Sequence, residues 1–235
     1  LTDRVIDRPM RPLFPKDYRN DVTLNNMVMS VDPQCNPEVV AMLGSSIATC
    51  ISDIPFDGPC AATQVGMIDG ELIINPTLEQ NAKSDLKLTV ASTREKVIMI
   101  EAGANEVPEA KMIEAIFEAD KVNKEIIAFI DKIVADCGKA KHSYESCAVP
   151  EELFAAMKEI VTPEEMEVAV FSDDKQTREE NIRQVTAKLE EAFADNEEWL
   201  AVLGEAVYQY QKKTVRKMIL KDHKRPDGRA ITQIR

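Results

Sequence analysis

The sequence has few of the side chains from which metal centres and nucleophilic sites are usually assembled. Its 235 residues contain two histidines, His142 and His223, which leaves little material for an all-histidine metal site or a Ser/His/Asp triad. We expect both to be ordinary surface histidines. The cysteines are odd in number and never closer together than ten residues, so neither a paired-cysteine zinc site nor a disulfide framework is expected. They are typical of reduced cysteines in a cytosolic protein: Cys35, Cys50, Cys60, Cys137 and Cys147.

Long apolar runs are also missing from the sequence, and its first residues are not apolar. No run approaches the roughly 18 to 20 residues needed to cross a bilayer, and residues 1–11 contain acids and arginines where a secretory signal would be apolar. The sequence therefore predicts a cytoplasmic protein with no membrane partner. With 44% hydrophobic and 30% charged residues, it can bury a normal core. It begins without methionine, inside what resembles an amphipathic segment, so we expect an interior piece of a longer protein.

Negative charge dominates the sequence, but it is concentrated in one stretch. The formal net charge is −12, and residues 143–215 hold 17 acidic and 7 basic side chains. Residues 1–20 instead hold five basic against three acidic side chains, and residues 216–235 hold seven against two. Phosphate contacts in nucleic-acid complexes come mainly from lysine and arginine. The two basic ends could therefore contact a nucleic acid, although the overall charge argues against one.

The first 138 residues have the pattern of an α+β domain. A short helix is expected to begin at Thr2 or Asp3, which can cap it, and to end near Pro9 and Pro12. Residues 22–31, rich in β-branched and apolar side chains, predict a strand. Apolar residues at helical spacing then predict two helices, at 37–51 and 108–138. Four further strands are expected between these helices, at residues 62–68, 71–75, 86–90 and 96–102.

The rest of the chain has a helical pattern. Residues 139–150 are polar and predict a linker. Apolar residues at helical spacing then mark three segments, at 153–161, 182–193 and 199–210, the last of which could continue toward residue 219. We interpret residues 145–215 as a small all-helical domain and residues 216–235 as the opening of another domain.

Five short motifs resemble the polynucleotide phosphorylase family, in the order in which that family has them. Residues 1–15 read LTDRVIDRPMRPLFP, an order that amphipathicity does not require. The other motifs are NPEVVA at 36–41, IPFDGP at 54–59, NPT at 75–77, and RPDGR at 225–229 with IR at 234–235. The resemblance implies an α+β, RNase PH-like (ribosomal protein S5 domain 2-like) core followed by an all-α domain. It divides the chain into most of a first core at 1–140, a helical linker domain at 145–215, and the start of a second core at 216–235.

The resemblance also implies an activity for the longer protein. Members of this family form ring-shaped homotrimers around a channel for single-stranded RNA, in which inorganic phosphate attacks the 3′ end and releases nucleoside diphosphates. Cations and a Mg²⁺ ion would offset the charge on the transferred phosphoryl group. In this family those residues belong mainly to the second core, so we expect this piece to supply scaffold and RNA path, to bind no Mg²⁺ and to be inactive alone. Partners in an RNA-degrading assembly are also implied.

Six residues are candidates for contacts with RNA or phosphate. Helical spacing places the first three on one face, where they could meet RNA phosphates or pair with Asp3, Asp7 and Asp17. The other three form a turn in which two hydroxyls and a guanidinium could hold a phosphate, although such turns are also common structural elements. The candidates are Arg4, Arg8, Arg11, Ser92, Thr93 and Arg94.

Asp85 and Lys87 are the candidates for catalysis. Residues two apart on a strand share a face, and the pair resembles a metal-binding aspartate and neighbouring lysine of active RNase PH-like cores. Asp85 is therefore also a candidate metal ligand, with a surface strand pair as the alternative. Two other hypotheses stay open: a self-sufficient phosphorolytic RNase that uses the first core, and a non-enzymatic interaction module.

Overall fold

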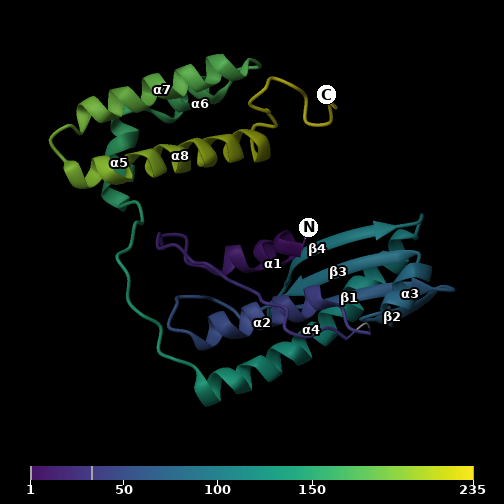
Figure 1. Ribbon diagram of the computed structural model, residues 1–235. Coiled ribbons are helices and arrows are strands. Elements are labelled where there is room, and N and C mark those ends of the chain that lie inside the picture. The colour runs from purple at the N-terminus through teal and green to yellow at the C-terminus, as the bar shows by residue number, and fades with distance from the viewer. Residues whose placement is uncertain (1, 33, 235) are drawn as a thin grey trace. The chain divides into compact units, whose positions relative to one another are not determined.

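The computed structural model describes residues 2–32 and 34–234. Leu1, Pro33 and Arg235, which belong to motifs or boundaries named above, lie outside the described residues. The chain divides into two compact units, Leu1–Ser146 and Cys147–Arg235 (Figure 1). The first combines a sheet with helices and the second contains helices, as the α+β prediction requires.

A four-stranded antiparallel sheet forms the centre of the first unit. Its strands are β1 (Ala61–Ile68), β2 (Glu71–Ile74), β3 (Leu86–Ser92) and β4 (Val97–Ala104), in the order β2-β1-β3-β4. The Asp69-Gly70 turn joins β1 to β2, with φ of 52° and 83°. Both angles lie in the left-handed region that a tight hairpin turn of this kind requires. The hairpin and the two following strands are thus confirmed.

Helices cover both faces of this sheet. On one face, Val65 and Leu88 pack with Ala115 and Ala119 of the long helix α4 (Glu109–Cys137). On the other face, Ala62 and Ala91 pack with side chains of α1 (Thr2–Met10) and α2 (Pro37–Ile51). Because successive side chains of a strand point to opposite faces, neighbouring residues of β1 and β3 enter different cores. The long helix ends at Gly138, as predicted.

The predicted strand at residues 22–31 is wrong. This segment forms no helix or strand, and Met27 and Met29 are 81% and 85% exposed. Only the first part of the segment approaches the core, where Leu24 is half-buried. A strand is stable only when its backbone pairs with a neighbour, and no strand of residues 2–32 or 34–234 lies in register with it. Composition favoured the extended state, but the pairing partner decides whether a strand forms.

Two short helices of the first unit have local causes. The helix α1 ends at Met10, between Pro9 and Pro12 as expected, and a short 3-10 helix, η1 (Arg11–Leu13), follows. The helix α3 (Leu78–Lys83) was not predicted. Thr77 and Gln80 cap each other's backbone N–H groups there, which satisfies two donors that a helix leaves unpaired.

The stretch after α4 forms no helix or strand, yet its first part is fixed to the sheet-containing unit. The Lys141 ammonium group donates to the carbonyl oxygens of Thr49, Cys50 and Ser52 at 3.1, 2.9 and 2.7 Å. These carbonyls lie at the C-terminal end of α2, where a cation is favoured. The Lys139 N–H also donates to Ile51 O at 3.0 Å. Residues 139–146 therefore belong structurally to the first unit.

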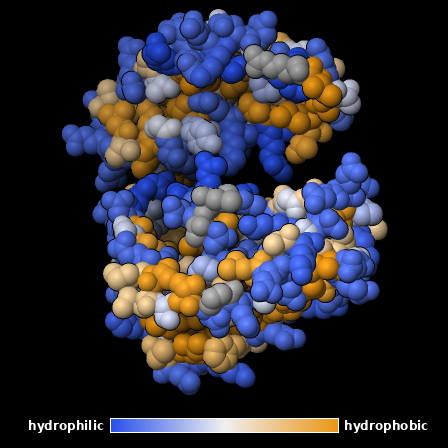
Figure 2. Space-filling model, turned by 45° about the vertical axis from the view of Figure 1, so that its right-hand side comes forward, coloured by the Kyte–Doolittle hydropathy of each residue, from blue (hydrophilic) through white to orange (hydrophobic). Residues whose placement is uncertain are grey.

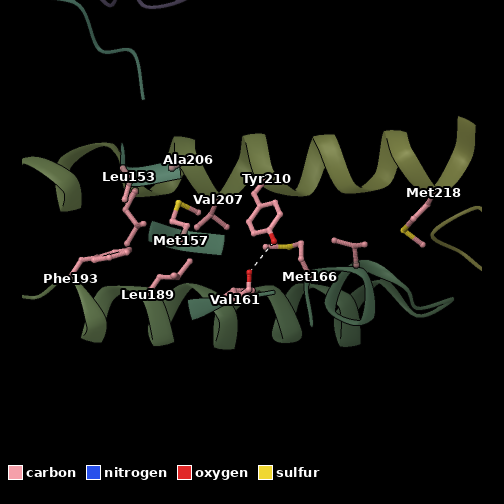
Figure 3. Close-up of a cluster of buried hydrophobic side chains, with 12 residues drawn as sticks. Leu153, Met157, Val161, Met166, Leu189, Phe193, Ala206, Val207, Tyr210 and Met218 are labelled. Carbon is pink, nitrogen blue, oxygen red and sulfur yellow. Dashed lines mark hydrogen bonds between the residues drawn. The ribbon is translucent and has the colours of Figure 1, made fainter. Parts of the chain in front are cut away.

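The second unit consists of four helices around one apolar core (Figure 3). They are α5 (Glu151–Ile160), α6 (Pro163–Val170), α7 (Lys175–Ala192) and α8 (Glu197–Leu220). Three helices were predicted. The helix α6 was missed because it is short and begins only a few residues after α5 ends, so its apolar residues looked like a continuation of α5. Its signal is the capping box of Thr162 and Glu165 around Pro163 at the first helical position. No described helix in either unit is both long enough and apolar enough to span a bilayer.

The C-terminal tail folds back onto this helical unit. The Ser172 N–H donates to Pro226 O at 2.9 Å, and the Lys224 N–H donates to Met218 O at 2.9 Å. Asp227 accepts from Arg225 and Arg229, and these hydrogen bonds lower the pKa of its carboxyl. The assignment of residues 216–235 to the start of a second core stays a prediction, and α8 itself runs on to Leu220.

Removing the hydroxyl of Tyr210 is expected to destabilise the helical unit. Tyr210 is 4% exposed and its hydroxyl donates to Val161 O at 2.9 Å (Figure 3). Tyr210→Phe leaves this carbonyl without a donor, so the free energy of unfolding should fall by about 1 to 2 kcal/mol. Urea unfolding followed by fluorescence of Trp199, the single tryptophan, measures this unit. Tyr208→Phe, on the exposed face of the same helix, is the matched control and should change nothing; equal effects of both substitutions would contradict the assignment.

Candidate functional site

The three N-terminal arginines lie in or directly after α1 and are exposed. The Arg8 guanidinium pairs with Glu101 of β4 at 3.2 Å. Arg11 donates to both carboxylate oxygens of Asp7 at 2.7 and 3.1 Å, a hydrogen-bonded pairing that raises the pKa of Arg11. Arg4 has no ion pair within the described part of the chain. Two of the three predicted RNA contacts are therefore engaged with carboxylates.

Of the acidic residues near these arginines, Asp7 and Asp17 have different partners. Asp7 pairs with Arg11, whereas Asp17 accepts hydrogen bonds from Ser146 and, at 2.9 Å, from Tyr144. These two donors lower the pKa of the Asp17 carboxyl. Asp17 therefore fixes residues 144–146 to the N-terminal segment and is not a partner of the arginines.

A cavity of about 710 Å³ borders α1 and the segment that follows it. Both basic and acidic side chains line it, and apolar residues such as Met10 and Phe14 form part of its wall. The charged residues of its lining are Asp3, Asp7, Arg11, Lys16, Arg19 and Asp21. Its mixed charge does not by itself select an anionic ligand, but Arg11 connects it to the predicted arginine face.

Asp85 and Lys87 are both exposed; Asp85 directly precedes β3, and Lys87 is the second residue of that strand. The Asn105 amide donates to Asp85 Oδ1 at 3.4 Å. Lys87 lines a second cavity, of about 630 Å³, whose charged lining also includes Asp3 and Glu38; Asp85 does not line it. The two candidates therefore have different surroundings.

The surroundings of Asp85 supply few ligands for a metal ion. Residues 2–32 and 34–234 contain no group of three or more His, Cys, Asp or Glu side chains placed to hold a metal ion. Mg²⁺ in phosphoryl-transfer sites is held by one or two carboxylates together with substrate phosphates. Asp85 offers a single carboxylate, so its role as a metal ligand stays a prediction.

Ser92, Thr93 and Arg94 do not converge on a common point. Ser92 is buried, and its Oγ accepts from the Asn123 amide at 3.2 Å. The Thr93 hydroxyl donates to Lys96 O at 3.3 Å and closes its own turn. Arg94 donates to the Asp131 carboxylate of α4, and this hydrogen bond raises the pKa of its guanidinium. Each group has a structural partner, so a phosphate would have to displace at least one of them.

The buried cysteines are not nucleophiles at neutral pH. Burial raises the pKa of the Cys60 thiol to about 12 and raises the pKa of Cys50 as well. Thiolates, not thiols, carry cysteine reactivity, so both side chains act as small apolar residues of the core.

Basic side chains collect on the C-terminal half of α8. Residues 212–229 hold eight lysines and arginines against two acids, whereas α5 and α6 are acidic and α7 is balanced, with four basic and four acidic side chains. Lys212, Lys213, Arg216 and Lys217 are all exposed. Figure 2 shows a largely hydrophilic surface on both units, with hydrophobic patches on each. Lys212 and Lys213 fall within the acidic stretch at residues 143–215, so they were not predicted to contact RNA. Their spacing could have indicated it, because Lys212 lies four residues before Arg216, and Lys213 four before Lys217, so each pair shares a helix face.

Two family descriptions match parts of this chain. Residues 58–122, which contain the sheet and the first half of α4, match the 3′ exoribonuclease family, domain 2. Residues 152–230, which contain the four helices and the tail, match the polyribonucleotide nucleotidyltransferase RNA binding domain. The two matched segments fall within the two compact units.

Curated relatives match the chain over its whole length. It is 74% identical to the polyribonucleotide nucleotidyltransferase of Lachnoclostridium phytofermentans, 49% to that of Ruminiclostridium cellulolyticum and 44% to that of Bacillus velezensis. All of the chain is covered in each comparison, but only 34%, 33% and 34% of these relatives. The chain thus spans about a third of the length of the relatives it matches.

The side chain of Asn123 should be essential for the stability of the first unit. It is fully buried; its amide donates to Val90 O at 3.0 Å and to Ser92 Oγ, and its carbonyl accepts from Thr63 at 2.8 Å. Asn123→Ala removes these contacts, so we expect the free energy of unfolding of the first unit to fall by about 2 to 4 kcal/mol. Scanning calorimetry measures the loss. Lys121→Ala, on the exposed face of α4, should shift the transition little, and a comparable shift would contradict the structural role of Asn123.

Proposed function

Because the chain belongs to the polyribonucleotide nucleotidyltransferase family, we propose that it is part of a 3′-to-5′ phosphorolytic exoribonuclease of single-stranded RNA. In that role it supplies scaffold and RNA path. The observation that carries the proposal is the 74% identity over the full chain, together with the match of residues 152–230 to the family's RNA binding domain. The activity belongs to the longer protein, of which this chain is about a third.

The chemistry of phosphorolysis explains why this part alone should be inactive. An oxygen of inorganic phosphate attacks the phosphorus of the last internucleotide linkage, and the bond to the 3′ oxygen of the preceding nucleotide breaks. The products are a nucleoside diphosphate and an RNA one nucleotide shorter, whose new 3′ hydroxyl takes up a proton. Such a transfer needs several cations directed at one phosphate. Among the described candidates, Ser92, Thr93 and Arg94 are held by separate structural partners.

The arginines of the first unit are suited to an RNA path. Side chains of Arg8 and Arg11 are 51% and 76% exposed, and exposed ion pairs contribute little stability. A phosphate can therefore replace Glu101 or Asp7 at small cost. Arg4 is exposed on the same helix and free to contact RNA directly. Contacts of this kind position a nucleic acid without reading its sequence.

The partners and setting proposed for the longer protein follow from its family. They are a homotrimer around an RNA channel, inorganic phosphate as co-substrate, Mg²⁺ held elsewhere in the enzyme, and partners in an RNA-degrading assembly. We place the protein in the cytoplasm, which suits its free cysteines.

The 235-residue chain should bind single-stranded RNA weakly and should not degrade it. With a fluorescent oligoadenylate at low salt we expect a Kd of about 1 to 100 µM that weakens steeply as salt rises, because phosphate contacts release counterions. Incubation with polyadenylate, phosphate and magnesium should release no ADP above background. Fluorescence anisotropy and chromatography of the products measure the two outcomes.

A variant at Asp85 distinguishes this proposal from its alternatives. If the chain releases ADP and Asp85→Ala abolishes that release, the proposed inactivity of this part is wrong and a self-sufficient site is favoured. That site would use Asp85, Lys87, Ser92, Thr93 and Arg94. Absence of RNA binding at low salt, with a protein partner retained, would instead favour a non-enzymatic interaction module.

A further inference from the structure

We propose that Tyr208, Lys212 and Arg216 of α8 form a binding site for single-stranded RNA, with Lys213 and Lys217 beside it. The inference rests on the proposed function, because it names the surface of the helical unit that RNA contacts. No family description or relative assigns residues to such a contact. The site combines an exposed aromatic ring with cations at regular spacing.

Helix geometry places the three residues in one row. They are four residues apart, which corresponds to a rise of about 6 Å from each to the next on the same face of a helix. The opposite face of α8 is turned into the core, where Val207, Tyr210 and Met218 are buried (Figure 3). Tyr208 is 57% exposed, and Lys212 and Arg216 are exposed as well. The row therefore faces solvent along two turns of a rigid helix.

The charges of this row are not compensated. Within the described part of the chain, Lys212 and Arg216 have no ion pair and Tyr208 has no hydrogen-bond or ring partner. Basic residues of α7 differ: Lys175 pairs with Glu179 at 3.5 Å, and Arg183 pairs with Glu180 at 2.6 Å. An unpaired cation attracts a phosphate without first losing a carboxylate partner.

The flanking lysines extend the positive surface. Lys217 approaches Glu167 only at 4.0 Å, a distance at the limit of an ion pair. The ammonium group of Lys213 lies 4.0 Å from the centre of the Phe154 ring, which keeps it near the surface of the bundle without neutralising its charge. Both remain available to a second phosphate of a strand that crosses the helix.

An exposed tyrosine among cations favours single strands over duplexes. In a single strand the bases are accessible to stack on an aromatic ring while the phosphates contact lysine and arginine. In a duplex the base faces are covered by their neighbours, so Tyr208 would add nothing to its binding. The chemistry recognises no particular base, because every base has a face that can stack.

Charge-matched variants of the 235-residue chain test the phosphate contacts. With a fluorescent oligoadenylate as probe, K212A/R216A should bind at least ten-fold more weakly at low salt. Its plot of log affinity against log salt should be less steep by about 1.4, since each phosphate contact in a single strand contributes about 0.7 to the slope. K175A/R183A removes the same charge from α7 and should bind within two-fold of the parent. Equal losses in both double variants would overturn the site, because they would reflect total charge alone.

Variants of Tyr208 test the stacking contact. Tyr208→Ala should weaken binding of the single strand about five-fold or more, whereas Tyr208→Phe keeps the ring and should bind like the parent. Neither change should alter binding of a double-stranded RNA of the same length. Equal affinity of parent and Tyr208→Ala for the single strand would overturn stacking on this residue.

The outcomes separate this inference from the proposed function. Failure of the parent chain to bind RNA would count against the proposed function itself. Binding by the parent that neither K212A/R216A nor Tyr208→Ala changes would leave the proposed function standing and overturn the site on α8. Displacement of the oligoadenylate by an equal concentration of polyglutamate would also overturn it, since it would identify an acidic protein segment as the preferred ligand.

Discussion

The two-residue period of β1 and β3 is the constraint on which the first unit depends. Both faces of these strands carry apolar residues, and each is covered by helices, so the side of the strand on which a residue lies decides its surroundings. Leu88 and Val90 enter the core beneath α4, and Ser92 follows them there, to a hydrogen bond with Asn123. Lys87 has the opposite parity and lines a surface cavity. A hydroxyl that looked available for phosphate is thus part of the core.

Ion pairing separates the basic side chains into those that have a carboxylate partner and those that do not. Arg94 and Arg8 are cationic and partly exposed, yet each has a carboxylate within reach on a distant segment, Asp131 and Glu101. Lys212 and Arg216 on α8 have no such partner in the described part of the chain. Anion binding follows from uncompensated charge more than from the number of basic residues, which is why a chain of net charge −12 can still offer RNA a surface. The acidic helices α5 and α6 would strengthen the preference, because their field repels RNA from their part of the unit's surface.

The proposed division of labour follows from what each unit contains. Phosphorolysis requires cations that point at one phosphate, and the sheet-containing unit spreads its candidates over separate structural contacts. RNA binding requires only an accessible positive surface with aromatic groups, and the helical unit has both. Under the proposed function, the residues of this chain hold and guide a strand whose terminal bond is broken by another part of the longer protein.

The sequence by itself determined the elements whose cause is local, and the family. The Asp69-Gly70 hairpin was predictable because its turn needs left-handed backbone angles, and the long helix because Pro108 and Gly138 bound an apolar stripe. Short motifs identified the family because no helix or strand pattern demands them. Tertiary structure decided the rest: residues 22–31 needed a pairing partner to become a strand, and Ser92 needed a neighbouring helix to become buried. Such outcomes depend on contacts between segments far apart in the chain, and local propensity contains no information about which segments meet.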